Sequence, residues 1–413
     1  MRLHYRTNDV TGLPLNDFGY PQFSLAERAR RFAAVRGRMK SCGLEVIIVR
    51  SDSSKCDSGS AEGRYLTHIG GNGEEGYVVF DLREDPMYTS WRPAHIENLL
   101  RMQNWTTDLR PRDPSFEHVV AARVKELGQE RARIGLVGLG GPPIHEGGKW
   151  PHIAYERLRG LLPEAEFVDF GHDFARIKAV KSPEEIACHE KTAELNDAAI
   201  EVMYDHARPG VRATEVYGRM IGAMVAGGAE MPVMVFFGAA PTARITTRLP
   251  PHRELRAGDV ILNEITSKYA GYWTQVHIPV AVGRGPDRVH QRLFDVTMEA
   301  TRSGEAALRH GVTQHELARS IREPIERAGL YSDAMPQYKG IGLGFSEFPV
   351  CPPRGASADP ELYPPIEANM VITFEVIAYD EKANAALHLA ENYLVTERGC
   401  RRLGRHPMEF RVT

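Results

Sequence analysis

The chain has 413 residues, of which 42% are hydrophobic and 25% charged, and its formal net charge at pH 7 is −3. This length predicts two or three domains with large cores, and the near-neutral charge gives no support for a nucleic-acid-binding surface. No apolar run approaches the roughly 20 residues that span a bilayer, and the N-terminus lacks the apolar segment of a secretion signal. The 5 cysteines are scattered without a CxxC motif. We therefore expect free thiols and a cytoplasmic location.

The first part of the chain alternates helix-like and strand-like segments. After an irregular arm over residues 1–22, the amphipathic segment 23–43 predicts a helix that begins at the N-cap Ser24 and ends at the C-cap Gly43. Apolar runs then predict strands at 44–50, 77–82, 133–139 and 165–170. This alternation is typical of an α/β domain, which we place at residues 1–176.

A second unit begins at the segment IKAVKSPEEI, where Ser182 is a helix N-cap and Pro183 takes the first helical position. It contains an internal repeat, because residues 207–230 resemble residues 308–331. In both copies a small-residue turn leads through Val and Thr to a Glu near the start of a new helix. Each copy follows a long helix and precedes strand-like sequence. The repeat predicts pseudo-two-fold symmetry within a domain at residues 177–413.

The stretch GDVILNEITSKYAGYWTQVHIPVAVG, residues 258–283, predicts a hairpin with Ala-Gly in its turn. Three polar residues interrupt its apolar pattern, namely Glu264, Gln275 and His277. A buried polar group costs about 1–3 kcal/mol unless it is paired. These residues therefore need partners or a function.

Lys339 and Glu375 occupy similar positions, because each lies among apolar neighbours in a strand-like segment of the second repeat. Charged residues are rarely fully buried unless they are paired. Two carboxylates, one ammonium and one imidazole can form a nearly neutral buried cluster that is suited to proton transfer. We therefore expect Glu264, His277, Lys339 and Glu375 to form one catalytic site.

The order of these features resembles the creatinase, aminopeptidase P and prolidase family, which has the pita-bread fold. The resemblance covers nearly the whole chain. It rests on the IKxxKSPEEI segment, the duplicated helices, the GD–strand–GY hairpin, and the segments KGIGLG, NMVITFE and LVTERG. The implied architecture is an α/β N-terminal domain followed by an α+β pita-bread domain.

The resemblance also implies where two divalent metal ions would be held, by two Asp, one His and two Glu. In register, Glu264 and Gln275 take the two Asp positions, Lys339 takes the His position, Glu375 keeps a Glu position, and the last Glu position falls on Ala390. Gln is a poor substitute for an anionic ligand, Ala cannot bind a metal, and a lysine ammonium would repel one. We therefore expect no metal site and no cofactor.

This pattern of loss is similar to that of metal-independent members such as creatinase and ectoine hydrolase. Glu375 matches a substrate-binding glutamate of creatinase, and His277 replaces the other. The catalytic His of creatinase falls on Ile245 in strict register, although His252 lies in the same loop. The arginine that binds the creatine carboxylate is replaced by a segment with Glu74 and Glu75, which we expect to form an acidic lip that suits a cationic or amino-bearing substrate.

The resemblance implies a metal-independent, creatinase-like hydrolase that cleaves a C–N bond of a small solute. In this reading His277 shuttles the proton, Glu264 and Glu375 orient the substrate nitrogen, and Lys339 stabilises oxyanion charge. We assign substrate binding to five further residues, namely Gln275, Tyr272, Glu347, Arg354 and His252.

Three alternatives stay open. The first is an aminopeptidase P- or prolidase-like metallopeptidase, the second is a lyase of the same fold, and the third is a non-catalytic pita-bread module that binds peptides. Small-substrate relatives use one subunit to wall the pocket of the other, so we also expect a homodimer.

Overall fold

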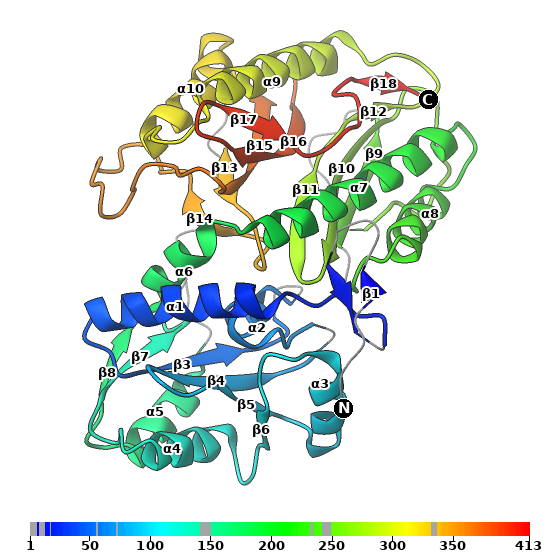
Figure 1. Cartoon of the computed structure of the whole chain (residues 1–413). Coiled ribbons are helices and arrows are strands. Elements are labelled where there is room, and N and C mark those ends of the chain that lie inside the picture. Colours follow the sequence, from blue (N-terminus) through cyan, green and yellow to red (C-terminus); the bar gives the residue numbers. More distant parts are fainter. Residues whose placement is uncertain are drawn as a thin grey trace. The chain divides into compact units, whose positions relative to one another are not determined.

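The computed structural model describes residues 6–7, 13–16, 18–54, 57–71, 73–140, 150–231, 234–241, 249–331 and 337–413. The chain folds into two compact units, which are described separately (Figure 1). The first comprises Met1–Lys178, Ser182–Ala187 and Leu343–Phe345, and the second comprises Ala179–Lys181, Cys188–Gly342 and Ser346–Thr413.

The first unit is built on a six-stranded sheet in the order β6-β5-β4-β3-β7-β8. Strand β3 pairs parallel to β7 and antiparallel to β4. The strands are β3 (Val46–Ser51), β4 (Gly76–Asp81), β5 (Met87–Ser90), β6 (Asp108–Pro111), β7 (Arg133–Val137) and β8 (Glu166–Asp169). The helices are α1 (Leu25–Ser41), α2 (Ala61–Thr67), α3 (Ile96–Met102), α4 (Phe116–Glu126), α5 (His152–Leu161) and α6 (Gly171–Ala179), and two short strands, β1 (Arg6–Thr7) and β2 (Pro14–Leu15), pair near the N-terminus.

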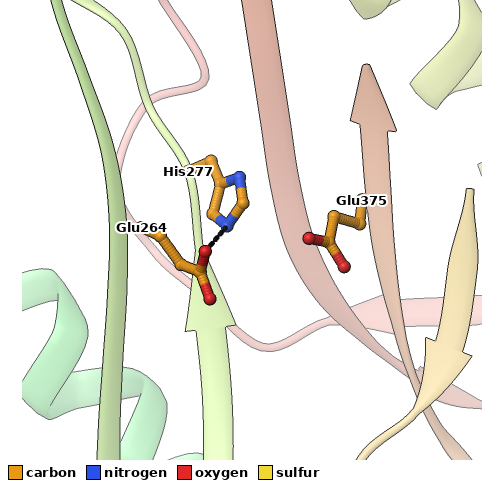
Figure 2. Close-up of side chains that lie close together, drawn as sticks. All are labelled: Glu264, His277 and Glu375. Carbon is orange, nitrogen blue, oxygen red and sulfur yellow. Dashed lines mark ion pairs between the residues drawn. The ribbon is translucent and has the colours of Figure 1, made fainter. Parts of the chain in front are cut away.

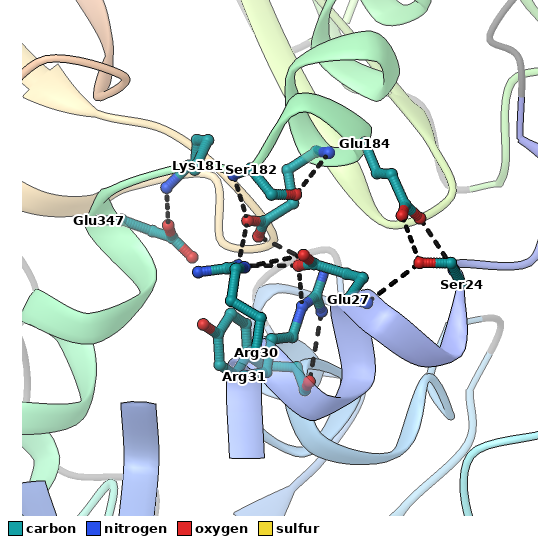
Figure 3. A network of polar contacts seen from close by, with 10 residues as sticks. Ser24, Glu27, Arg30, Arg31, Lys181, Ser182, Glu184 and Glu347 are labelled. Carbon is teal, nitrogen blue, oxygen red and sulfur yellow. Dashed lines mark hydrogen bonds and ion pairs between the residues drawn. The ribbon is translucent and has the colours of Figure 1, made fainter. Parts of the chain in front are cut away.

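A buried ionic network fixes the start of α1 in the first unit (Figure 3). The Arg31 guanidinium lies 2.6 Å from a Glu27 carboxylate oxygen and 3.5 Å from one of Glu185. Its flat faces also contact the rings of Phe23, Tyr65 and Trp105. We call Ser24, Glu27, Arg30, Arg31, Ser182, Glu184 and Glu185 the anchor network. Every buried charge in it has a partner of opposite sign or a hydrogen bond, which is what makes burial tolerable.

The second unit contains two five-stranded sheets. The first sheet is formed by β9 (Met234–Ala240), β10 (Val260–Tyr269), β11 (Tyr272–Val276), β12 (Val280–Ala281) and β18 (Arg411–Val412). The second is formed by β13 (Tyr338–Gly340), β14 (Glu347–Val350), β15 (Val371–Asp380), β16 (Ala385–Val395) and β17 (Cys400–Arg402). Four helices accompany them, namely α7 (Pro183–His206), α8 (Ala213–Ala226), α9 (Arg288–Ala307) and α10 (Gln314–Arg327). The sequence repeat thus corresponds to two helix pairs, each followed by a sheet.

One pair of backbone hydrogen bonds joins the two sheets. The His277 N–H donates to the Ala390 carbonyl, the Ala390 N–H donates to the His277 carbonyl, and both distances are 3.1 Å. One face of the first sheet is covered by α7, because Asn196 donates to Thr274 and Ser267 donates to the Thr192 carbonyl. The opposite face carries the polar residues singled out in the sequence.

The hairpin and the main strands agree with the sequence prediction. Ala270 and Gly271 both adopt positive φ, 48° and 88°, in the two-residue turn between β10 and β11, as a tight hairpin turn requires. Ser24 caps α1, which ends at the C-cap Cys42, one residue before the expected Gly43. The short strands β5 and β6 were not predicted. Within the described residues, no helix is long and apolar enough to cross a membrane.

Candidate active site

Strand register places four buried residues side by side across the two sheets of the second unit. Ile265 and Val276 are partners on β10 and β11. Glu264 precedes Ile265 and His277 follows Val276, so that the antiparallel register continues to this pair. His277 is bridged to Ala390, and Ala390 is the partner of Glu375 on β15. Directly opposed residues on neighbouring strands project from the same face. We call this line of Glu264, His277, Ala390 and Glu375 the cross-strand row.

The side chains of the row meet in a buried cluster (Figure 2). The His277 ring lies between the two carboxylates, with its Nε2 3.8 Å from Oε2 of Glu264. Gln275 Nε2 lies 2.8 Å from His277 Nε2 and donates to Glu375 Oε1 at 3.4 Å. Lys339 Nζ lies 3.0 Å from Glu375 Oε2. The five predicted residues Glu264, Gln275, His277, Lys339 and Glu375, which we call the site cluster, therefore lie together.

Burial sets the charge state of the cluster. It lowers the pKa of His277 to about 3, against a smaller opposing effect of Glu375, so that the ring is neutral at pH 7. Burial alone would raise the pKa of Glu375, but the Lys339 ammonium and its hydrogen bond bring the pKa below its ordinary value. Glu375 is thus a carboxylate paired with an ammonium.

The other predicted substrate-binding residues lie apart from the cluster. Tyr272 lies on the face covered by α7, where its ring packs edge-on against His189. Glu347 is buried and pairs with Lys181 at 3.3 Å (Figure 3), and Gly342 allows this pair because a Cβ there would collide with the Glu347 carboxylate. Arg354 pairs with Glu326 at 2.6 Å and is half exposed. His252 is exposed, and Ile245 lies outside the described residues.

The expected acidic lip is wrong for Glu74, which is buried in the first unit. Its carboxylate accepts hydrogen bonds from Ser90 at 2.8 Å and Tyr88 at 3.3 Å, and His95 Nδ1 lies 3.3 Å away. These partners satisfy the carboxylate within its own unit.

Two residues of the site were missed in the sequence. His388 stacks on His277 with ring centroids 5.8 Å apart and an interplanar angle of 24°. Asn392 holds the Gln275 backbone, because its side chain accepts from the Gln275 N–H at 3.2 Å and donates to the Gln275 carbonyl at 2.7 Å. Both are two residues from Ala390 on one strand, so that the period of two places them on its face. That parity was available in the sequence.

Comparison with known proteins identifies the family of the chain. The model of Metallopeptidase family M24 matches residues 187–397, and the chain belongs to that family. It is 25% identical over 409 residues to an uncharacterized hydrolase/peptidase, y4tL, of Sinorhizobium fredii, covering 94% of this chain and 97% of the relative. It is 25% identical over 237 residues to the Xaa-Pro dipeptidase of Pyrococcus furiosus, covering 57% of this chain and 65% of that protein.

Solved structures show the same fold. A Xaa-Pro dipeptidase from Bacillus anthracis matches with a TM-score of 0.76 at 19% identity, over 94% of this chain and 100% of that one. An X-Pro aminopeptidase from Thermotoga maritima matches with a TM-score of 0.77 at 18% identity, over 92% of this chain and 99% of that one.

The pita-bread fold predicted from the sequence is confirmed, and so is the prediction of a hydrolytic enzyme that acts on C–N bonds. Relatives in a metallopeptidase family support the peptidase alternative better than the creatinase-like reading.

The residues present do not fit the two-metal centre that the family name implies. An ammonium, Lys339, lies against Glu375, and Ala390 places a methyl in the middle of the row. The amide nitrogen of Gln275 is directed at both Glu375 and His277. Three ligand atoms of Glu264, His277 and Glu375 do lie within 4.8 Å of one another, which is close enough for a single ion. Such an ion would have to displace the amide N–H of Gln275 from His277 Nε2 and compete with Lys339 for Glu375.

Proposed function

We propose that the chain hydrolyses a C–N bond of a small substrate that bears an amino, amide or amidine group, and that Lys339 takes the place of a metal ion. The observation that carries the proposal is the 3.0 Å contact between Lys339 Nζ and Glu375 Oε2 inside the cluster. A fixed cation in a buried site can stabilise the negative charge that develops on a carbonyl oxygen during hydrolysis.

The cluster supplies a route for the protons. Glu264 can draw a proton from the attacking water and pass it to Nε2 of His277, which lies 3.8 Å away. The imidazolium so formed then gives the proton on Nδ1 to the leaving nitrogen and returns to a neutral ring, and the new C–O bond to the water oxygen replaces the C–N bond that breaks. Gln275 serves both protonation states of His277 because its amide can present a donor or an acceptor.

A panel of substrates tests this proposal. The purified chain is assayed with Xaa-Pro dipeptides, other dipeptides, amino-acid amides, N-methyl compounds and cyclic amidines, each with and without a chelator. The proposal predicts hydrolysis of at least one small amide or amidine that survives the chelator. Failure to turn over any member, with or without added Mn²⁺, Co²⁺ or Zn²⁺, would overturn it.

The second candidate is a metallopeptidase of the prolidase or aminopeptidase P kind. The family match favours it, and so does the proximity of three possible ligand atoms in Glu264, His277 and Glu375. It predicts cleavage of Xaa-Pro bonds that the chelator abolishes and added metal restores. The same panel therefore separates the two candidates. Family membership favours either over a non-catalytic module or a lyase.

We also propose a homodimer in the cytoplasm. The four described cysteines are free thiols, namely Cys42, Cys188, Cys351 and Cys400, as expected in a reducing compartment. Light scattering should give twice the 46.1 kDa mass of the chain. A clean monomer at micromolar concentration would contradict the dimer.

A further inference from the structure

The centre of the cross-strand row is occupied by the smallest side chain in it. Ala390 lies between His277 and Glu375. Its methyl group cannot form a hydrogen bond, whereas its neighbours on the same face are long polar side chains. His388, one step along the same face of β16, is 7% exposed and stacks on His277.

Around Ala390, several buried polar atoms lack a hydrogen-bond partner among the described residues. They are Thr266 Oγ1, Gln275 Oε1, His277 Nδ1 and both ring nitrogens of His388. All four residues lie on the face that carries the site cluster. Native proteins rarely leave buried polar atoms unpaired, because each has lost its hydrogen bonds to water. So many in one place indicate that a polar ligand completes the site.

The hydrogen-bonding character of these atoms follows from Gln275. Its amide nitrogen is directed at His277 Nε2 and Glu375 Oε1, so that Gln275 Oε1 is left as an acceptor. Because Nε2 of the neutral ring then accepts, Nδ1 of His277 carries the proton and is a donor. A neutral His388 offers one donor and one acceptor.

The charge of the site follows from the same groups. Counted formally, two acidic side chains, Glu264 and Glu375, face one basic side chain, Lys339, whose Nζ lies 3.0 Å from Glu375. His277 is neutral because its Nε2 accepts from the Gln275 amide, and His388 is a buried ring with no carboxylate hydrogen-bonded to it among the described residues. The site therefore carries a formal charge of about one negative unit, which complements a ligand with one positive charge.

We propose that His388 is a substrate-binding residue, and that the ligand which lies over Ala390 is a small monocation that also carries an acceptor oxygen. The cationic nitrogen donates to Gln275 Oε1 beside Glu264, and the oxygen accepts from the N–H group of His388, next to the His277 ring. This inference rests on the proposed function only for the identity of the reacting bond.

Binding of a probe tests the inference apart from catalysis. Glycinamide has one ammonium and one carbonyl, acetamide lacks the charge, and glycolate carries the opposite charge. In NMR titrations of the intact chain at pH 7, glycinamide should shift the ring signals of His277 and His388, and the other two probes should not. If no probe shifts these signals, or glycolate shifts them most, the inference is wrong.

Two variants then separate binding from folding. His388→Leu removes both unpaired nitrogens, so that its melting temperature should stay at or above that of the parent chain while glycinamide affinity falls about tenfold. His388→Asn keeps a donor and an acceptor and should retain part of the affinity. The matched control is His189→Leu, because His189 is buried on the opposite face with one unpartnered nitrogen; its glycinamide affinity should be unchanged.

The outcomes distinguish this inference from the proposed function. If the chain hydrolyses a substrate and His388→Leu leaves KM unchanged, the role of His388 is refuted and the hydrolase stands. If glycinamide binds through His388 but no C–N bond is cleaved, the binding site stands and the proposed function fails. A fall in melting temperature for His388→Leu without loss of affinity would show a purely structural histidine.

Discussion

The anchor network of the first unit and the site cluster of the second both bury charged and polar side chains. They differ in how completely these side chains are hydrogen-bonded. In the anchor network, Arg31 contacts two carboxylates and three aromatic rings, and no member has an unpartnered buried side-chain atom among the described residues. In the site cluster, Gln275 and His277 each keep one. Complete pairing indicates a structural role, and incomplete pairing marks the place where a ligand is expected.

The largest expected effect comes from removing the cation of each cluster. Lys339→Met leaves the buried Glu375 carboxylate without its cation, which costs about 3–5 kcal/mol of unfolding free energy. Arg31→Met should cost less, because Arg30 still lies 2.8 Å from Glu27 and 2.9 Å from Glu185. Lys339→Met should also abolish hydrolysis, whereas Arg31→Met should spare kcat in the molecules that remain folded. Urea unfolding and single-turnover assays measure both. A Lys339→Met chain with unchanged stability would refute the buried ion pair.

The next largest effect is expected from substitutions that convert the site cluster into a metal site. Gln275→Asp, Lys339→His and Ala390→Glu together supply the ligands that the family pattern places at these positions. The triple variant should bind Mn²⁺ or Zn²⁺ and gain about 2.7 kcal/mol of stability when the metal is at 100 times its Kd. Calorimetric titration measures the affinity, and the parent chain is the control. If the parent binds as tightly, the metal-excluding role of Lys339 is wrong.

Stability should also depend on pH through the buried histidines. Burial lowers the pKa of His189 to about 3 from an ordinary value of 6.5. The unfolded chain therefore binds the proton first as the pH falls, and stability present above pH 6.5 is lost progressively toward pH 3. Each such histidine contributes a slope of at most about 1.4 kcal/mol per pH unit. His189→Leu should flatten the profile of unfolding free energy between about pH 4 and 6.5. An unchanged slope would contradict the lowered pKa of His189.

The smallest effect concerns Thr266, whose buried hydroxyl has no partner among the described residues. Thr266→Val removes that hydroxyl at nearly constant volume and should stabilise the chain by about 1 kcal/mol. The matched change Thr192→Val removes a hydroxyl that donates to the Cys188 carbonyl at 2.6 Å and should be neutral or destabilising. Thermal unfolding compares the two, and equal losses would show that the site face is as well paired as the rest of the core.

The sequence predicted the fold and the cluster through different signals. Alternation and the repeat located β10, β11 and β15, and an interrupted apolar pattern identified Glu264, His277 and Glu375. The same alternation excludes Tyr272, because an even-numbered residue of β11 cannot share a face with Gln275 and His277. The period of two likewise places His388 on the face of Ala390, although His388 matches no ligand position of the family.

Other parts of the structure had no local signal. The bridge between His277 and Ala390 joins strands from the two repeats, and no spacing along the chain encodes it. The pairing of Glu74 with Ser90 and Tyr88 likewise depends on the neighbouring strands of the first unit. The short strands β5 (MYTS) and β6 (DLRP) escaped prediction because neither contains the apolar run that marked the other strands of the sheet.

We propose that Lys339 serves where a metal would otherwise act. The most direct measurement is the metal content of the purified chain by elemental emission, with hydrolysis of its best substrate assayed before and after treatment with a chelator. If Lys339 takes the place of the metal, the purified chain should contain no stoichiometric transition metal, and its rate should be unchanged after chelation. One or two tightly bound ions per chain, with activity that is lost on chelation and restored by metal, would contradict it.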